Sequence, residues 1–323
     1  MADNKHRTTD TQSFPYVFIQ NQDIPLKTYE KGLLRCNVFL PKDAVPFGGK
    51  QYPVIATYGP CVYSILSNIK AADAVEDGKD VPYESFFKKS WSQVNPQMKS
   101  AHSAWETPDP GFWTSHGYIV VRADERGSGQ SPGILDTMSQ GTSEAFFDVV
   151  EWCSEQEWSS GKVGLLGISY FAGTQWRVAA RRPKGLAAII PWEGMSDYYR
   201  DRVRHGGILS DKFISKSNVS RLLSPVGGKL IYPRLTRTTC TEFWWENGVQ
   251  PNQYGTPGRA VRNWGQDTLE GDLNQEQLLD NRQNQMLDTA KHKYMDEEYY
   301  QSRNFDLANI DVPLLSVANW VST

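Results

Sequence analysis

Short apolar runs recur along the first 192 residues, and glycine, proline or polar residues separate them. Apolar runs of this length between turn signals are typical of strands. Most of them are continuously apolar, which is the pattern of strands buried on both faces of a sheet. They predict strands at 33–40, 52–58, 117–123, 162–168 and 186–192, and another at 312–318.

Apolar residues three and four positions apart predict helices between these strands. The stretch 142–158 places Phe146 and Val149 on one helical face. The stretch 171–181 reads as a second helix, which Pro183 closes. Strands that alternate with helices imply an α/β fold, with a mostly parallel sheet covered on both faces.

The pattern changes after residue 192. Residues 193–309 are polar and aromatic, with helical spacing at 275–300 and no strand as apolar as those before it. We therefore expect a core in two parts, 1–192 and 310–323, which a helical insertion at 193–309 interrupts.

Composition narrows the class of protein. The 323 residues carry 34 basic and 37 acidic side chains, for a net charge of −3. No block of like charge indicates a nucleic acid or a membrane surface as partner. The start of the chain is polar, without the apolar segment of a signal peptide, and no apolar run approaches the ~18 residues of a membrane span. Four cysteines are scattered without paired spacing, which argues against disulfides or zinc: Cys36, Cys61, Cys153 and Cys240. We expect a cytoplasmic enzyme without metal or cofactor, and the sequence leaves its oligomeric state open.

One serine lies at a junction that suits nucleophilic catalysis. Ser169 follows Gly167 where the strand at 162–168 meets the helix at 171–181. A sharp strand-to-helix turn exposes a hydroxyl, and the helix N-terminus behind it stabilises developing negative charge. The short form of this motif has glycine where this chain has Phe171. The alternative is a serine that only caps the helix.

Three blocks, together with the strand at 52–58, resemble the X-Pro dipeptidyl-peptidase-like (CocE/NonD) branch of the α/β-hydrolases over roughly residues 30–320. The blocks are GFWTSHGYIVVRADERGSGQSPG at 111–133, EAFFDVVEWCSEQEWSSGKVGLLGISY at 144–170, and TQW at 174–176 followed by IIPWEGMSDYYRD at 189–201. The resemblance implies an α/β-hydrolase core with a helical cap inserted after the sixth strand, then a C-terminal jelly-roll. It also implies cleavage of esters or amides through a serine nucleophile.

The resemblance assigns roles to particular residues. Ser169 matches the nucleophile, and Tyr170 matches the residue whose backbone N–H forms half of the oxyanion hole. The family's other oxyanion donor is usually a tyrosine hydroxyl in a Pro-Tyr pair after the second predicted strand, where this sequence has Cys61. A thiol is a weak donor. Tyr58 and Tyr63 lie close by in the sequence as substitutes, and Cys61 is otherwise a small buried turn residue.

The rest of the catalytic triad departs from the family. The triad acid should follow the strand at 312–318, where Trp-x-Asp is common in the family, but Ser322 stands at the Asp position after Trp320. The base should follow one more strand. Instead the histidines precede Ser169 or fall in the insertion: His6, His102, His116, His205 and His292. We therefore expect a C-terminally truncated member that lacks the jelly-roll and is inactive or nearly so.

Two further groups of residues are candidates for the site. Trp192 and Glu193, at the entry to the cap, could contact substrate, as could Cys61 and Tyr63. For Glu193 the alternative is a charge at a helix N-terminus. The Asp124-Glu125-Arg126 run resembles a metal or acid cluster, but in the family it supports the nucleophile turn, so we expect no metal there.

Three functions are compatible with these residues. The first is a serine hydrolase that cleaves a small ester or amide through an acyl-enzyme on Ser169. The second is a non-catalytic fragment or pseudo-enzyme of that family. The third is an acyltransferase on the same scaffold, which would transfer the acyl group to an acceptor other than water.

Overall fold

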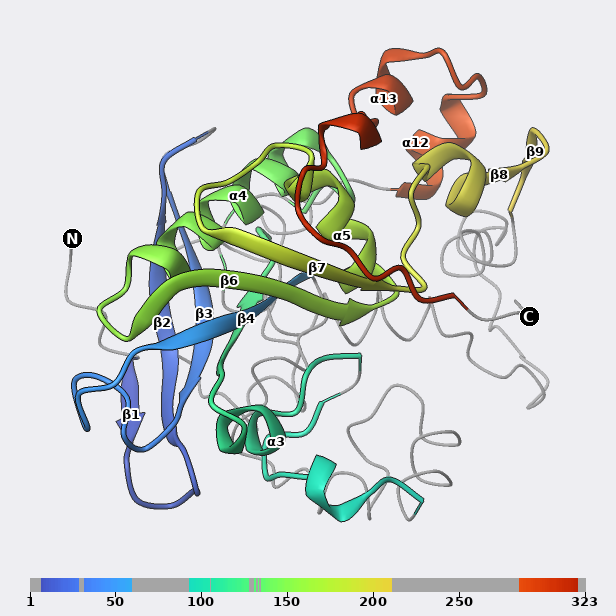
Figure 1. The fold of residues 1–323 in the computed structure, drawn as a ribbon. Coiled ribbons are helices and arrows are strands. Elements are labelled where there is room, and N and C mark those ends of the chain that lie inside the picture. The colour runs from blue at the N-terminus through green and yellow to red at the C-terminus, as the bar shows by residue number, and fades with distance from the viewer. Residues whose placement is uncertain are drawn as a thin grey trace, which may run out of the picture.

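One mixed sheet organises the residues that the computed structural model describes, which are 7–28, 32–59, 93–104, 106–127, 131, 133, 135–210 and 285–318. Seven of their strands form this sheet in the order β1-β2-β3-β5-β4-β6-β7 (Figure 1). The strands are β1 (Thr8–Asp10), β2 (Val17–Leu26), β3 (Gly32–Leu40), β4 (Tyr52–Gly59), β5 (Ile119–Asp124), β6 (Ser159–Ile168) and β7 (Leu186–Trp192).

The sheet has an antiparallel and a parallel half. Strands β1, β2, β3 and β5 are antiparallel neighbours, whereas β5, β4, β6 and β7 run parallel. Parallel neighbours need crossover connections, usually helices, and α5 (Tyr170–Ala179) forms the crossover from β6 to β7. The expected α/β fold is confirmed.

The five strands predicted before the insertion all form, as β3, β4, β5, β6 and β7. The first two strands were not predicted. In β2 an apolar start gives way to polar residues and Pro25, and the pairing with β3 shifts between Ile19 and Gln22. Asn21, inside this irregularity, has a φ of 55°. The bulge breaks the two-residue alternation on which strand prediction depends.

Helices cover both faces of the sheet (Figure 1). Helices α4 (Gln140–Glu155) and α5 pack on one face, and the short α3 (Pro110–Ser115) lies on the other. Each of α3 and α4 begins with a side-chain cap: Asp109 accepts from the amide of Phe112 at 2.9 Å, and Ser139 from that of Thr142 at 3.2 Å. The caps satisfy amides that have no partner within the helix.

The main core lies between the sheet and helices α4 and α5. From α4 it takes Phe146, Val149, Val150 and Cys153, the face that the apolar period predicts. The facing strand residues include Leu34, Val38, Ala56, Val121 and Leu165. Cys36 and Cys153 are buried free thiols, whereas Cys61 and Cys240 lie outside the described residues.

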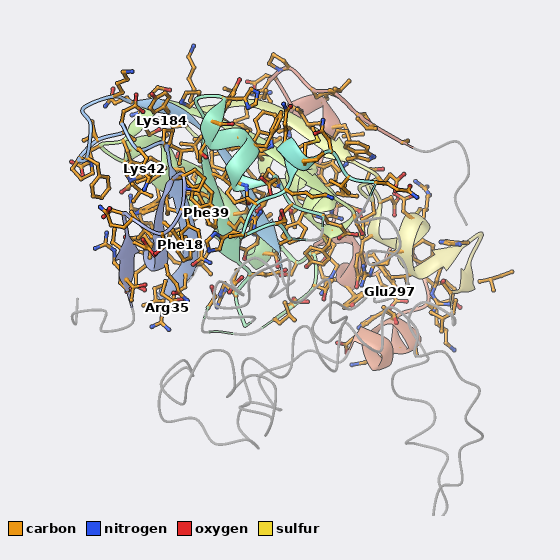
Figure 2. All side chains as sticks on the ribbon, turned by 90° about the horizontal axis from the view of Figure 1, so that it is seen from below. Phe18, Arg35, Phe39, Lys42, Lys184 and Glu297 are labelled. Atoms are coloured by element: carbon orange, nitrogen blue, oxygen red, sulfur yellow. The ribbon has the colours of Figure 1, made fainter. Side chains whose placement is uncertain are left out.

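A smaller aromatic cluster occupies the opposite face. The rings of Phe18 and Phe39 stack with centroids 5.0 Å apart, and Figure 2 shows them side by side. The ring of His102 lies 4.4 Å from Phe18 and 5.2 Å from Phe39. Beside them, the buried Arg122 donates to the carbonyl oxygens of His102 (2.7 Å) and Pro108 (2.6 Å). These bonds fasten the 102–108 segment to β5.

The described part of the insertion consists of short elements. They are the π-helix η3 (Tyr198–Val203), the two-stranded β8 (Arg204–His205) and β9 (Ile208–Leu209), and the helices α12 (Gln285–Lys291) and α13 (Glu298–Gln301). Two 3-10 turns complete the described elements, η2 (Pro96–Met98) before α3 and η6 (Leu307–Asn309) near the end.

The helix expected over 275–300 is not continuous. Residues 275–284 lie outside the described part, and α12 ends before α13 starts. Between them Glu297 accepts hydrogen bonds from the amides of Lys293 and Tyr294, both at 2.7 Å. A carboxylate that binds these amides stabilises a turn at the point where a helix would need them for its own ladder.

The segment predicted as a strand at 312–318 returns to the sheet beside β7. It makes two parallel bridges, Ile189 with Leu314 and Trp192 with Val317. Figure 1 shows this segment running along β7. The division into 1–192, 193–309 and 310–323 remains a prediction. In the described part of the chain, no helix has the length and apolar character that crossing a bilayer requires.

Candidate active site

Ser169 occupies a strained turn between β6 and α5. Its φ of 61° and ψ of −116° lie outside the regions that L-residues prefer. It stands at the N-cap position of α5, yet its side chain makes no capping hydrogen bond. The alternative of a serine that only caps the helix is therefore wrong. Strain of this kind costs about 1–3 kcal/mol and persists only where the surroundings fix it.

Backbone hydrogen bonds fix this turn from several directions. The amide of Ser169 donates to the carbonyl oxygen of Trp192 at 2.9 Å, and the amide of Ile168 donates to Glu106 at 3.1 Å. The carbonyl of Ser169 accepts from the amides of Ala172 (3.1 Å) and Gly173 (2.9 Å). The turn is thereby tied to the end of β7, to a loop and to α5.

Phe171, the departure from the short motif, is accommodated by glycines on two strands. Its side chain is buried, and a Cβ added to Gly167 would lie 2.5 Å from its own Cβ. A Cβ on Gly59, at the end of β4, would lie 2.8 Å from its ring. Glycine is thus required at Gly59 and Gly167 because Phe171 fills the space that side chains there would need.

Tyr170 is the first residue of α5, and its hydroxyl joins a buried network. It donates to Glu125 Oε1 at 3.1 Å and accepts from the amide of Met138 at 3.3 Å. The hydroxyl of Thr142 donates to the same Glu125 oxygen at 2.6 Å. Burial raises the pKa of Glu125 to about 8, so this carboxyl is mostly protonated at neutral pH.

From the sequence, Glu125 was assigned only to the Asp124-Glu125-Arg126 run with a structural role. Its hydrogen bond to the hydroxyl of Tyr170 was not predicted. Within that run, Asp124 is fully buried at the end of β5, and its carbonyl accepts from the hydroxyl of Ser131. Arg126 is half-buried and packs over Gly133, whose added Cβ would lie 3.2 Å from Arg126 Nε. Within the described residues no cluster of metal-ligating side chains forms.

A family model for X-Pro dipeptidyl-peptidases (S15 family) matches residues 32–322, which include the whole of this turn. The chain belongs to the S15 family. Its members include CocE/NonD hydrolases, and their fold is the α/β-hydrolase architecture described above.

Individual members of this family are similar to the chain in sequence or in structure. The cocaine esterase of Rhodococcus sp. (strain MB1 Bresler) is 36% identical over 146 residues, which are 43% of this chain and 25% of the esterase. The Xaa-Pro dipeptidyl-peptidase of Pediococcus pentosaceus is 25% identical over 227 residues, 58% of this chain and 27% of the peptidase. A solved CocE/NonD family hydrolase from Staphylococcus aureus superposes with a TM-score of 0.58 at 23% identity. That match covers 92% of this chain and 40% of the other. The chain therefore spans about a quarter of the length of the curated relatives.

Trp192 and Glu193 lie next to the turn at Ser169. The carbonyl of Trp192 binds the amide of Ser169, and its side chain is 41% exposed. Glu193 is exposed, has a φ of 54° and donates its amide to Val317 at 2.7 Å. It lies four residues before Asp197, the N-cap of η3. Glu193 is therefore not a charge at a helix N-terminus, which was the alternative.

Four of the five histidines are described, and each has a partner other than Ser169. His102 Nδ1 lies 2.6 Å from the hydroxyl of Tyr16, and His116 Nδ1 lies 2.7 Å from the carbonyl of Phe112. His205 Nε2 lies 3.2 Å from the carbonyl of Asp201. Among the described histidines, none makes a hydrogen bond to the nucleophile candidate.

His292 differs from the other three because its partner is a carboxylate. Its Nδ1 lies 2.7 Å from Glu297 Oε2, and its ring stacks on Tyr299 with centroids 4.6 Å apart. Figure 2 shows Glu297 beside the C-terminal helices. An acid on Nδ1 is what orients a catalytic histidine.

Several predicted residues lie outside the described part of the chain. They are Cys61 and Tyr63, the candidates near the second oxyanion donor, Ser322 at the expected acid position, and His6. Tyr58, the other substitute donor, is fully buried, and its hydroxyl accepts from the amide of Arg126 at 3.4 Å.

Proposed function

We propose that this S15 member is a serine hydrolase that cleaves a small ester or amide through an acyl-enzyme on Ser169. The observation that carries the proposal is the strained backbone of a serine that forms no cap. A φ of 61° strains the backbone of Ser169, and its side chain makes no capping bond that would stabilise α5 in return. Strain that brings no stability is typical of functional sites.

The proposed reaction follows from the position of Ser169. Its Oγ attacks the carbonyl carbon of the substrate and passes its proton to a base, and the alcohol or amine then leaves with that proton. Water next attacks the acyl-enzyme and releases the acid. The N-terminal end of α5, with the backbone N–H of Tyr170, would stabilise the oxyanion in both steps. A base is required because a serine hydroxyl is a poor nucleophile when protonated.

Trp192 and Glu193 are the proposed substrate contacts in the described part of the chain. The hydrogen bond from Ser169 to the Trp192 carbonyl keeps the end of β7 beside the nucleophile. The exposed Trp192 ring offers an apolar surface for an acyl group, and the exposed Glu193 carboxylate offers a partner for a substrate ammonium. Cys61 and Tyr63 remain proposals for the same pocket.

Labelling with a fluorophosphonate tests the nucleophile, because this probe reacts with activated serines. Stoichiometric labelling of Ser169, located by peptide mass spectrometry and abolished in Ser169→Ala, would support the proposal and contradict the inactivity that the unassigned triad acid and base predict. No labelling of folded protein would instead favour the non-catalytic member of the family. A panel of esters and X-Pro amides then separates esterase from peptidase, and added alcohols or amines reveal acyl transfer.

The same assay identifies the base. His292→Ala and His205→Ala are compared with wild type, since both histidines lie in the insertion and only His292 is paired with a carboxylate. Loss of labelling in His292→Ala alone would assign the base to His292. Unchanged labelling in both variants places the base elsewhere in the protein.

A further inference from the structure

A polar pocket of about 200 Å³ lies between the first turn of α4, the C-terminal half of α5 and the segment 302–309. It is separate from the nucleophile turn, because Arg177 in its wall is seven residues, or about 10 Å, along α5 from Tyr170. Its lining is rich in hydroxyl, amide and guanidinium groups. The polar lining residues are Ser139, Gln140, Ser143, Arg177, Arg181, Ser302, Arg303, Asn304, Asp306 and Asn309.

Arg177 is the decisive group in this wall. Its side chain is only 3% exposed, yet it forms no salt bridge to a described carboxylate. Its Nε donates to the carbonyl of Arg303 at 3.1 Å and its Nη1 to that of Gly173 at 3.0 Å, while Nη2 has no hydrogen-bond partner. The guanidinium also lies 5.1 Å from the ring centre of Phe305. A buried charge without a counter-ion is costly, so the site favours an incoming anion.

The other two guanidinium groups of the lining have carboxylate partners. Arg181 donates to the hydroxyl of Ser143 at 2.6 Å and pairs with Glu144 at 3.4 Å. Arg303 is paired with Asp136. The carboxylate in the lining is Asp306, whose Oδ1 accepts from the amide of Ala308 at 2.9 Å. Two of the three guanidinium groups are thus paired with carboxylates, and Arg177 is the one without a described counter-ion.

The first turn of α4 adds a second source of positive potential. Its N-cap Ser139 and its first residue Gln140 both line the pocket. The helix has 16 residues, so its N-terminal end carries the partial positive charge of a full helix dipole. Amides and dipole at such an end favour phosphate and carboxylate groups.

We propose that this pocket binds a small oxyanion, a phosphate or carboxylate group, between Arg177, Arg181 and the N-terminus of α4. The volume is below that of pockets for drug-sized ligands, which restricts the ligand to a compact group. Because the pocket joins α4 and α5 to residues 302–309, the anion would fasten the returning end of the insertion to the core. This role is independent of the proposed hydrolysis at Ser169.

Isothermal titration calorimetry of the full chain with inorganic phosphate tests the proposal. Sodium chloride at matched ionic strength is the reference, because phosphate also stabilises proteins through exclusion from their surface. Acetate in a parallel titration separates phosphate from carboxylate recognition. We expect saturable, stoichiometric binding of at least one of the two anions.

Three variants locate the binding. Arg181→Gln removes a half-exposed guanidinium and should weaken binding about tenfold or more, as loss of a charged hydrogen bond does. Arg177→Met should weaken it at least as much, and circular dichroism checks its folding. Arg200→Gln removes an exposed arginine outside the pocket and should leave the dissociation constant within about twofold of wild type.

Two results would overturn the site. One is the absence of saturable binding by either anion above the chloride reference. The other is equal affinity in Arg181→Gln and Arg200→Gln, which is decisive even when Arg177→Met does not fold.

Discussion

The hydroxyl of Tyr170 and the carboxyl group of Glu125 meet through a hydrogen bond of 3.1 Å in the core, one residue after the nucleophile candidate. Glu125 is fully buried, and Thr142 of α4 donates to the same oxygen. The first turn of α5 is thereby held by β5 and α4. Burial penalises the charged carboxylate, so the protonated form of Glu125 has the lower free energy in this site.

Replacing Glu125 should change how stability depends on pH. The pKa of Glu125 is raised from 4.5 to about 8 in the folded protein. Between these values the folded state binds a proton that the unfolded state has lost, so this residue makes stability fall as pH rises from about 4.5 to 8. Glu125→Gln mimics the protonated form and should remove that loss. Urea unfolding midpoints at pH 5, 6.5 and 8 measure the difference.

Glu155→Gln is the control for that series, since Glu155 is half exposed in a surface pair with Lys27. The urea unfolding midpoint of Glu155→Gln should vary with pH as that of wild type does. Equal slopes for Glu125→Gln and wild type would show that Glu125 is ionised in the folded protein, contrary to our expectation.

Substitutions at Ser169 separate a strained nucleophile from a helix cap. Because the side chain makes no cap bond, Ser169→Ala should leave the free energy of unfolding within about 0.5 kcal/mol of wild type. Ser169→Gly should raise it by about 1 kcal/mol, since glycine adopts a positive φ without strain. Chemical denaturation of both variants gives these values. A loss of more than about 1 kcal/mol in Ser169→Ala, the usual cost of losing a cap, would contradict the prediction.

Gly167→Ala should destabilise the turn at Ser169. The added methyl would lie 2.5 Å from Phe171 Cβ, so α5 or β6 has to shift. Overpacking of this kind costs about 1–3 kcal/mol, and fluorophosphonate labelling of Ser169 should fall with it. Gly164→Ala, in the same strand, meets nothing closer than 3.8 Å and should be nearly neutral. Similar melting temperatures for the two variants would argue against the packing role of Phe171.

Arg122→Met should destabilise the fold without a direct effect on the turn at Ser169. The buried guanidinium donates to the carbonyls of His102 and Pro108, and methionine would leave both oxygens unpaired. We expect a loss of about 3 kcal/mol in the free energy of unfolding. Arg200→Met, at an exposed surface pair, should cost under about 1 kcal/mol. Urea unfolding compares them, and equal losses would mean that Arg122 contributes no more than a surface charge.

The sequence determined the elements and the family. Apolar runs predicted β4 to β7 and an alternating run predicted β3, while helical spacing predicted α4 and the stretch closed by Pro183 predicted α5. Such patterns can be read from the sequence because each reflects the burial of one local stretch of chain. The sequence also located the strained turn at Ser169, since Gly167 and Ser169 lie within a few residues of each other. Local signals failed where the backbone is irregular, as at the bulge of β2 around Asn21 and at the break that Glu297 stabilises.

Tertiary structure alone decided what surrounds that turn. Glu125 and Tyr170 are 45 residues apart, and Gly59 and Phe171 are 112 apart, so no period or motif in the sequence links them. The same holds for the pocket that Arg177 shares with residues 302–309. Hydrophobic periodicity records which face of an element is buried, whereas the partners on that face depend on how distant elements pack.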